Sequence, residues 1–155
     1  MYTVFDIANW YLQNVPDITN KKLQKLVYYA YAWHLAISND SVEALDSRLF
    51  VNEFEAWVHG AVTPSLYNAY KDNGSAIITK PQGVHLPNFS ADEIDIMQQV
   101  ATIYGKYNGN ELESINHQED PWRKARRDLT QYEPSHNAIT DAAIYEYYSV
   151  QLTNA

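Results

Sequence analysis

The sequence contains no cysteine. This absence excludes disulfide bonds, thiol nucleophiles and thiolate metal sites, and it is typical of a reducing compartment. The first ten residues lack a basic cluster and include Asp6, so they do not resemble a signal peptide. No apolar run approaches the ~20 residues that cross a bilayer. We therefore expect a cytoplasmic protein with no membrane partner.

Basic residues are also scarce. The chain has 11 Lys and Arg against 19 Asp and Glu, a net charge of -8, which argues against non-specific nucleic-acid binding. Seven of the 11 lie in two short clusters, Lys21, Lys22, Lys25 and Arg123, Lys124, Arg126, Arg127. The second cluster could be a solvated helix face, a contact for an acidic protein partner or a contact for nucleic acid. Nucleic acid is the least favoured of the three, because the remaining surface is acidic.

The standard catalytic motifs are missing as well: there is no phosphate-binding loop, no G-x-S-x-G elbow and no H-E-x-x-H. A metal site is conceivable from His117, Glu119 and Asp120 with His34 or His59. However, His117 and Glu119 are two residues apart and would face away from each other on a helix, which favours capping and polar contacts. His34 fits a hydrogen-bonded core histidine better. We expect neither an enzyme nor a bound cofactor, and a metal-dependent hydrolase is the weakest alternative.

The chain does have enough apolar residues for a core. It has 155 residues, 46% of them hydrophobic, and 13 are tyrosines that suit a core edge or an interface. A chain of this length buries roughly 70% of its unfolded surface. We expect a single domain over residues 1–155.

A helix from Thr19 to Ser38 is the longest uninterrupted pattern. Its apolar residues recur at i, i+3, i+4 and i+7 through Ile37, and the other faces are apolar too, which is typical of a central, surrounded helix. Thr19 is the expected N-cap. Three lysines follow it at the unfavourable end of the helix dipole, so we expect them to have carboxylate neighbours.

Further helices are expected around it. Their expected starts are the Thr3–Asp6 cap, Thr63-Pro64, the Ser90–Glu93 capping box, Asn110 with Glu113, Asp120-Pro121, and Thr140. The helix that begins at Ser90 is expected to end at Gly109. Residues 54–58 alternate like a strand that Gly60 breaks, and Ala76 to Thr79 is a second candidate strand, with the loop at 81–87 able to close a hairpin. The prediction is a mainly α fold, a single helical domain around a central buried helix with a small two-stranded β element.

Three stretches together resemble the Panacea antitoxin domain, also called the SocA-like or GepA-like family of bacterial and phage proteins. They are KLQKLVYYAYAWHLA (22–36), EAWVHGAVTPSLY (55–67) and HQEDPWRKAR (117–126). Their order and separation match, and the frame runs from the first expected helix to the last. One departure is that the family's middle motif usually reads Tyr-Gly-Pro-Val, whereas this chain has His59-Gly60-Ala61-Val62.

The resemblance implies a helical protein that neutralises a cognate toxin by binding it. In the SocA-like member the antitoxin is an adaptor that delivers its toxin to an ATP-dependent protease, and in others direct masking is expected. Neither mode requires catalysis. The alternative is a phage- or mobile-element-encoded inhibitor of a host defence or regulatory protein.

The expected partner-binding residues combine the basic clusters with aromatic and arginine anchors, although tryptophans are more often core residues. They are Lys22, Lys25, Trp57, Tyr67, Trp122, Arg123 and Arg126. The two basic clusters are expected to meet in one patch, which is either a docking point for an anionic partner or equally a place where Glu119 and Asp120 pair with them internally.

Overall fold

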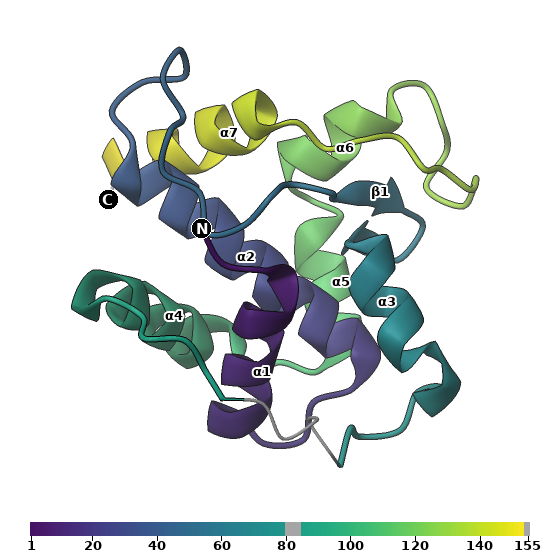
Figure 1. The fold of residues 1–155 in the computed structure, drawn as a ribbon. Helices are drawn as coiled ribbons and strands as arrows, with labels where there is room; N and C mark the ends of the chain where they lie inside the picture. The colour runs from purple at the N-terminus through teal and green to yellow at the C-terminus, as the bar shows by residue number, and fades with distance from the viewer. Residues whose placement is uncertain (80–84, 154–155) are drawn as a thin grey trace.

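The computed structural model describes residues 1–79 and 85–153. That part of the chain forms seven α-helices, one short 3-10 helix and a two-stranded antiparallel sheet (Figure 1). In order they are α1 (Val4–Asn14), α2 (Asn20–Ser38), β1 (Glu55–Trp57), β2 (Gly60–Val62), α3 (Pro64–Tyr70), η1 (Lys71–Asn73), α4 (Ala91–Tyr104), α5 (Gly109–Asn116), α6 (Asp120–Arg126) and α7 (Asp141–Thr153). The predicted mainly α fold with a small β element is confirmed.

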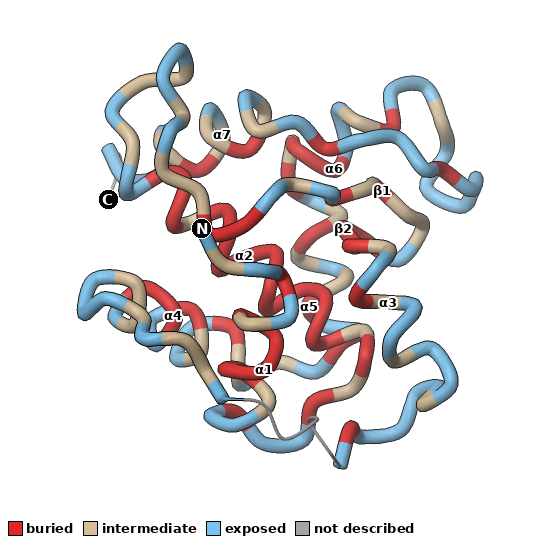
Figure 2. Tube along the Cα trace, in the orientation of Figure 1, coloured by how far each residue is buried: buried red, intermediate tan, exposed pale blue. Residues whose placement is uncertain are grey.

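Helix α2 runs through the middle of the molecule, and α1, α4, α5 and α7 all pack against it (Figure 1). It is buried along most of its length (Figure 2). Leu23, Leu26 and Val27 have no exposed surface at all. The predicted central helix is confirmed. The expectation that Ile37 is also inside is wrong, since 48% of it is exposed near the end of the helix.

The local start signals of the helices behave as the sequence predicts. Thr3 with Asp6, and Ser90 with Glu93, form reciprocal capping boxes at α1 and α4. The Thr19 hydroxyl accepts from a backbone N–H in the first turn of α2. Each contact satisfies a backbone donor that has no partner inside the helix.

The boundary between α4 and α5 differs from the prediction. Helix α4 ends at Tyr104, and α5 begins at Gly109 with a capping box formed by Asn108 and Glu111 instead of Asn110 and Glu113. Both pairs have the same spacing, so the sequence alone does not choose between them. Tertiary packing favours the earlier start, because a Cβ on Gly109 would lie only 3.1 Å from the Lys21 side chain of α2.

The sheet is a tight hairpin rather than a pairing of two distant strands. Ala56 of β1 pairs with Ala61 of β2. The prediction that Gly60 ends the β element is wrong. Gly60 begins the second strand instead, with φ at +103°. The second predicted strand, 76–79, is also wrong: Ile77 makes only an isolated bridge to Thr19. Residues 81–84 of the expected loop at 81–87 lie outside the described residues.

The core is rich in aromatic side chains. Tyr28, Tyr31 and Tyr148 have no exposed surface, and the equally buried Tyr29 stacks on Tyr104 with ring centroids 4.0 Å apart. These tyrosines lie inside the core and not at its edge. Among the helices of the described residues, none is long and apolar enough to cross a membrane.

Candidate functional site

The β1–β2 hairpin is held by two buried cations, one on each strand. Lys25 Nζ from α2 donates to the Ala61 carbonyl at 3.0 Å, and Arg126 Nη1 from α6 donates to the Ala56 carbonyl at 3.1 Å. Asn116 Oδ1 accepts the Ala61 N–H at 2.8 Å. Burial lowers the pKa of Lys25 to about 7, against the opposing effect of a nearby carboxylate. The hairpin backbone is thus fixed by charge-assisted bonds in a dry setting, where such bonds are strongest.

Two more contacts fix the ends of the hairpin. Gln24 Oε1 accepts the Thr63 N–H at 3.1 Å, just before α3. The indole N–H of Trp122 donates to the Trp57 carbonyl at 2.7 Å. Buried backbone groups need such partners, and here side chains from α2 and α6 supply them.

Gly60 allows this close approach. Its backbone is in a region that side chains rarely adopt, and an added Cβ would lie 2.5 Å from Lys25 Cε and 2.7 Å from Asn116 Oδ1. Neither contact is sterically possible without displacement. The glycine therefore serves both the turn and the insertion of the lysine.

Beside the hairpin, the carboxyl group of Glu119 is buried among polar donors. The Tyr29 and Tyr148 hydroxyls lie 2.7 and 3.0 Å from Glu119 Oε1, and Asn116 Nδ2 lies 3.4 Å from it. Burial raises the pKa of Glu119 to about 7, although these hydrogen bonds favour the carboxylate and act in the opposite direction.

The side chains considered as metal ligands face different partners. The His117 ring stacks on Trp122 with centroids 4.0 Å apart, and burial lowers the His117 pKa. Glu119 faces the tyrosines, and Asp120 lies 3.8 Å from Arg123. Across residues 1–79 and 85–153, no three His, Asp or Glu side chains are grouped so as to hold a metal ion. The described residues therefore offer no support for the hydrolase alternative.

A groove of about 520 Å³ lies next to the hairpin. The first turns of α2 and α5 form one side, and the hairpin, α3 and η1 form the other. The indole of Trp57 and the ring of Tyr67 meet edge to face in its wall, with centroids 5.0 Å apart. Apolar and basic side chains share the lining: Trp57, Val62, Tyr67, Lys21, Lys25, His59 and Lys71.

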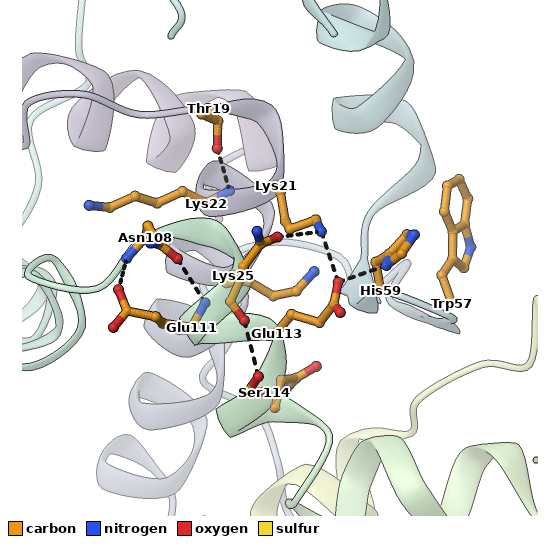
Figure 3. Close-up of polar contacts among 12 residues, drawn as sticks. Thr19, Lys21, Lys22, Lys25, Trp57, His59, Asn108, Glu111, Glu113 and Ser114 are labelled. Atoms are coloured by element: carbon orange, nitrogen blue, oxygen red, sulfur yellow. Dashed lines mark hydrogen bonds and ion pairs between the residues drawn. The ribbon is translucent and has the colours of Figure 1, made fainter. Parts of the chain in front are cut away.

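An ion-pair network closes one rim of this groove (Figure 3). Glu113 Oε1 lies 2.9 Å from Lys21 Nζ and 2.7 Å from His59 Nδ1. Burial alone would raise the pKa of Glu113, but Lys21 and His59 bring it below its usual value. Sequence reasoning missed this network and assigned Glu113 to a cap, since no local pattern links residues so far apart in the chain.

Comparison with family models matches residues 23–123 to the family described as Antitoxin SocA-like, Panacea domain. The chain belongs to this family. Neither the curated proteins nor the solved structures compared with it give a match. The match is narrower than the frame predicted from the sequence, because it leaves out α1 and α7.

The three motifs of the Panacea domain converge on the hairpin in this chain. Residues 22–36 reach it through Lys25, and residues 117–126 reach it through Trp122 and Arg126. The middle motif, residues 55–67, is the hairpin with the start of α3. The motifs therefore form one connected structural unit.

The departure from the usual middle motif has a local consequence. Ala61 stands where the Panacea domain usually has proline, and its N–H makes the 2.8 Å bond to Asn116 that a proline could not make. His59 stands where tyrosine is usual, and it reaches Glu113.

The seven predicted partner-binding residues divide by exposure. Trp57 and Tyr67 are half-buried in the groove wall, and the Arg123 side chain is 60% exposed. The other four are buried: Lys22, Lys25, Trp122 and Arg126. The partner-binding role of all seven remains a prediction.

The two basic clusters do not merge into an exposed docking patch, whereas the alternative of pairing with a carboxylate of the same chain is found for Asp120, which lies 3.8 Å from both Arg123 and Lys124. Lys25 and Arg126 do approach the same hairpin, but from inside the protein, and Lys22 Nζ donates to the Gly105 carbonyl at 2.6 Å. The expected carboxylate partner is found for Lys21 alone among the three lysines of α2, within the part of the chain that the structure describes. Backbone carbonyls satisfy the other two.

Proposed function

We propose that this protein is the antitoxin of a toxin–antitoxin pair and that it silences a cognate toxin by binding it. The observation that carries the proposal is the family match over residues 23–123. Binding is sufficient for neutralisation, so the proposal requires no catalytic residue and no cofactor.

The surface beside the hairpin supports a role in protein contact. Interface energy is concentrated in a few aromatic and arginine side chains, particularly where pockets hold them. Trp57 and Tyr67 form an aromatic pair in a groove, and Arg123 projects from α6 beside a second, open depression of about 670 Å³. We propose these three as direct contacts.

The buried members of the predicted set have a different proposed role. Lys25 and Arg126 bind hairpin carbonyls, and Trp122 binds the carbonyl of Trp57 itself. They support partner binding by holding the hairpin, and with it Trp57, in place. Their substitution would therefore weaken binding together with folding stability.

The test is growth rescue with the product of the neighbouring gene. The candidate toxin is expressed alone, with the wild-type protein, and with Tyr67→Ala or Arg123→Glu. The matched controls are Tyr132→Ala and Lys106→Glu, at exposed positions outside the groove lining. Wild type and controls should restore growth and co-purify with the toxin, while the two test variants should do so less well at equal amounts of folded protein.

The same experiment separates the mechanisms. Rescue that disappears when an ATP-dependent protease is deleted would assign the adaptor mode, and rescue that persists would assign masking. If the wild type neither restores growth nor co-purifies with a neighbouring product, the antitoxin proposal is wrong, and an inhibitor carried by a phage or mobile element becomes the better explanation.

A further inference from the structure

The groove beside the hairpin has a basic lining in an acidic protein. Of the described residues that line it, three are lysines, one is histidine, and none is aspartate or glutamate. The chain as a whole has 19 acidic and 11 basic residues. A concave site with one sign of charge concentrates ligands of the opposite sign.

Two of the lysines form no ion pair with the described residues. Glu113 pairs with Lys21 and His59 at the rim, but no carboxylate of the described residues lies within 4.0 Å of the ammonium of Lys25 or Lys71. Lys71 is exposed at the start of η1. Lys25 is only 1% exposed, and within the described residues the Ala61 carbonyl is its one hydrogen-bond acceptor, although an ammonium has three N–H groups.

The strands of the hairpin and α3 contribute the apolar part of the groove wall. The Trp57 indole N–H donates to Glu55 Oε1 at 2.8 Å, which fixes the ring against Tyr67. Val62 extends the wall beside them. A preformed wall of this kind binds apolar side chains with little cost of ordering.

We infer that the groove binds an acidic segment of the partner's chain that also carries an apolar side chain. The inference rests on the proposed function, because it states which part of the toxin the antitoxin holds. The apolar side chain lies against Trp57 and Tyr67, and the carboxylates face the exposed Lys71 and the basic side of the groove. A short acidic segment fits better than nucleic acid, since a long polyanion would extend from the groove over the acidic surface around it.

The test is a nuclear magnetic resonance titration of the intact, ¹⁵N-labelled protein with defined probes. The main probe is the blocked hexapeptide Asp-Glu-Leu-Phe-Asp-Glu. Three controls change one property each: Asp-Glu-Ser-Ser-Asp-Glu removes the apolar pair, Lys-Lys-Leu-Phe-Lys-Lys reverses the charge, and a thymidine 12-mer replaces peptide by single-stranded DNA. The main probe should shift the Trp57 indole signal and the amides of Gly74, Gly109 and Asn110, and it should bind more tightly than each control.

Two variants with the same charge change locate the effect. Lys71→Glu should lower the affinity for the main probe by about fivefold, because it replaces a weak attraction at an exposed position by repulsion. Lys106→Glu, exposed and outside the groove lining, should leave the affinity unchanged. Tyr67→Ala should weaken binding of the main probe but not of the serine control. The inference is overturned by absence of binding, by shifts away from the groove, by equal effects of the two lysine variants, or by tighter binding of the basic peptide or the DNA.

Failure of the inference differs from failure of the proposed function. Growth rescue by the wild type with no probe effect in the groove would refute the acidic-segment inference and leave the antitoxin proposal standing. Specific binding of the main probe without a toxic neighbouring product would support the acidic-segment inference and refute the antitoxin proposal.

Discussion

Replacing the buried acid by its amide, Glu119→Gln, should stabilise the protein at neutral pH, and the gain should grow as the pH rises. Only 9% of Glu119 is exposed, and burial raises its pKa from 4.5 to about 7. Between these two values the folded protein keeps a proton that the unfolded chain has released. The contribution of Glu119 to stability is therefore complete below about pH 4.5 and is lost as the pH rises through 7.

The magnitude follows from the pKa difference. Each pKa unit corresponds to about 1.4 kcal/mol, so the shift from 4.5 to about 7 amounts to at most about 3 kcal/mol at pH 8. Glutamine keeps a carbonyl oxygen for the hydroxyls of Tyr29 and Tyr148 and has no charge to bury. Any cost of fitting its amide group is independent of pH. It therefore shifts the plot of the stability difference against pH up or down without changing its slope.

The assay is urea unfolding of both proteins at pH 5, 6, 7 and 8. The difference in unfolding free energy between variant and wild type should increase by about 2.5 kcal/mol over this range, because part of the effect has already developed at pH 5. Burial lowers the pKa values of His34 and His117, but both histidines are common to the two proteins, so their effects on stability cancel in the difference. The design therefore isolates the single carboxyl group.

A control with the opposite sign is available at Glu113. Its pKa is below the usual value, so Glu113→Gln should lose stability relative to wild type as the pH rises through the range in which the carboxylate forms. If the difference for Glu119→Gln were flat from pH 5 to 8, Glu119 would be ionised throughout. The three donors around it would then outweigh burial, and the reasoning above would be refuted.

Three further predictions concern the core and the hairpin. Leu26→Ala, at the fully buried centre of α2, should cost about 2 to 5 kcal/mol in urea unfolding, and unchanged stability would contradict the central position of this helix. Gly60→Ala should lower the melting temperature, at a cost of about 1 to 3 kcal/mol, because its Cβ would collide with the Lys25 side chain; an unaltered melting temperature would refute the steric argument. Lys25→Met removes the bond to the Ala61 carbonyl and should lower the melting temperature, least at pH 7 and below, where the wild type must bury a charged ammonium, and more towards pH 10, as the folded wild type releases this proton. A difference in melting temperature that stays constant from pH 7 to pH 10 would show that Lys25 does not titrate in this range.

The helices could be predicted from the sequence because their signals are local. Capping pairs such as Thr3–Asp6 and Ser90–Glu93 lie three residues apart, and the all-round apolar pattern of residues 19–38 points to a surrounded helix. Where two local signals competed, prediction failed. The choice between Asn108 and Asn110 as the cap of α5 depends on packing against α2, which no short window contains.

The hairpin was harder to predict because its turn continues the apparent strand pattern. Val58 and His59 form the turn, yet Phe54, Ala56 and Val58 alternate like one strand. The φ value of Gly60 then permits immediate reversal of the chain, so the strand that ends at Trp57 pairs with one that begins three residues later at Gly60, instead of with residues 76–79.

The candidate site was predicted in part, and the errors concern charged residues. The prediction of a shared patch rested on the position of both basic clusters at helix starts, yet Lys25 and Arg126 are buried. One signal did indicate burial: Lys25 precedes the buried Leu26 and lies one turn before the buried Tyr29, on the inner side of α2. Burial of these cations depends on hairpin carbonyls more than 30 residues away, and helix periodicity carries no information about them.

The family motifs therefore have a physical interpretation that differs from a contact surface. In this chain three of their charged members, Lys25, Glu119 and Arg126, form bonds inside the protein, and two of them, Lys25 and Arg126, bind carbonyl groups of opposite strands of the hairpin. A hairpin of three residues per strand is too short to be stable alone, so its geometry depends on these supports. Trp57, fixed by its neighbours on that hairpin, is then presented at a constant position in the groove wall. Under the proposed function, we therefore expect exposed and half-buried groove side chains, such as Lys71 and Tyr67, to determine which toxin is bound, and the buried supports to fix the hairpin that carries Trp57.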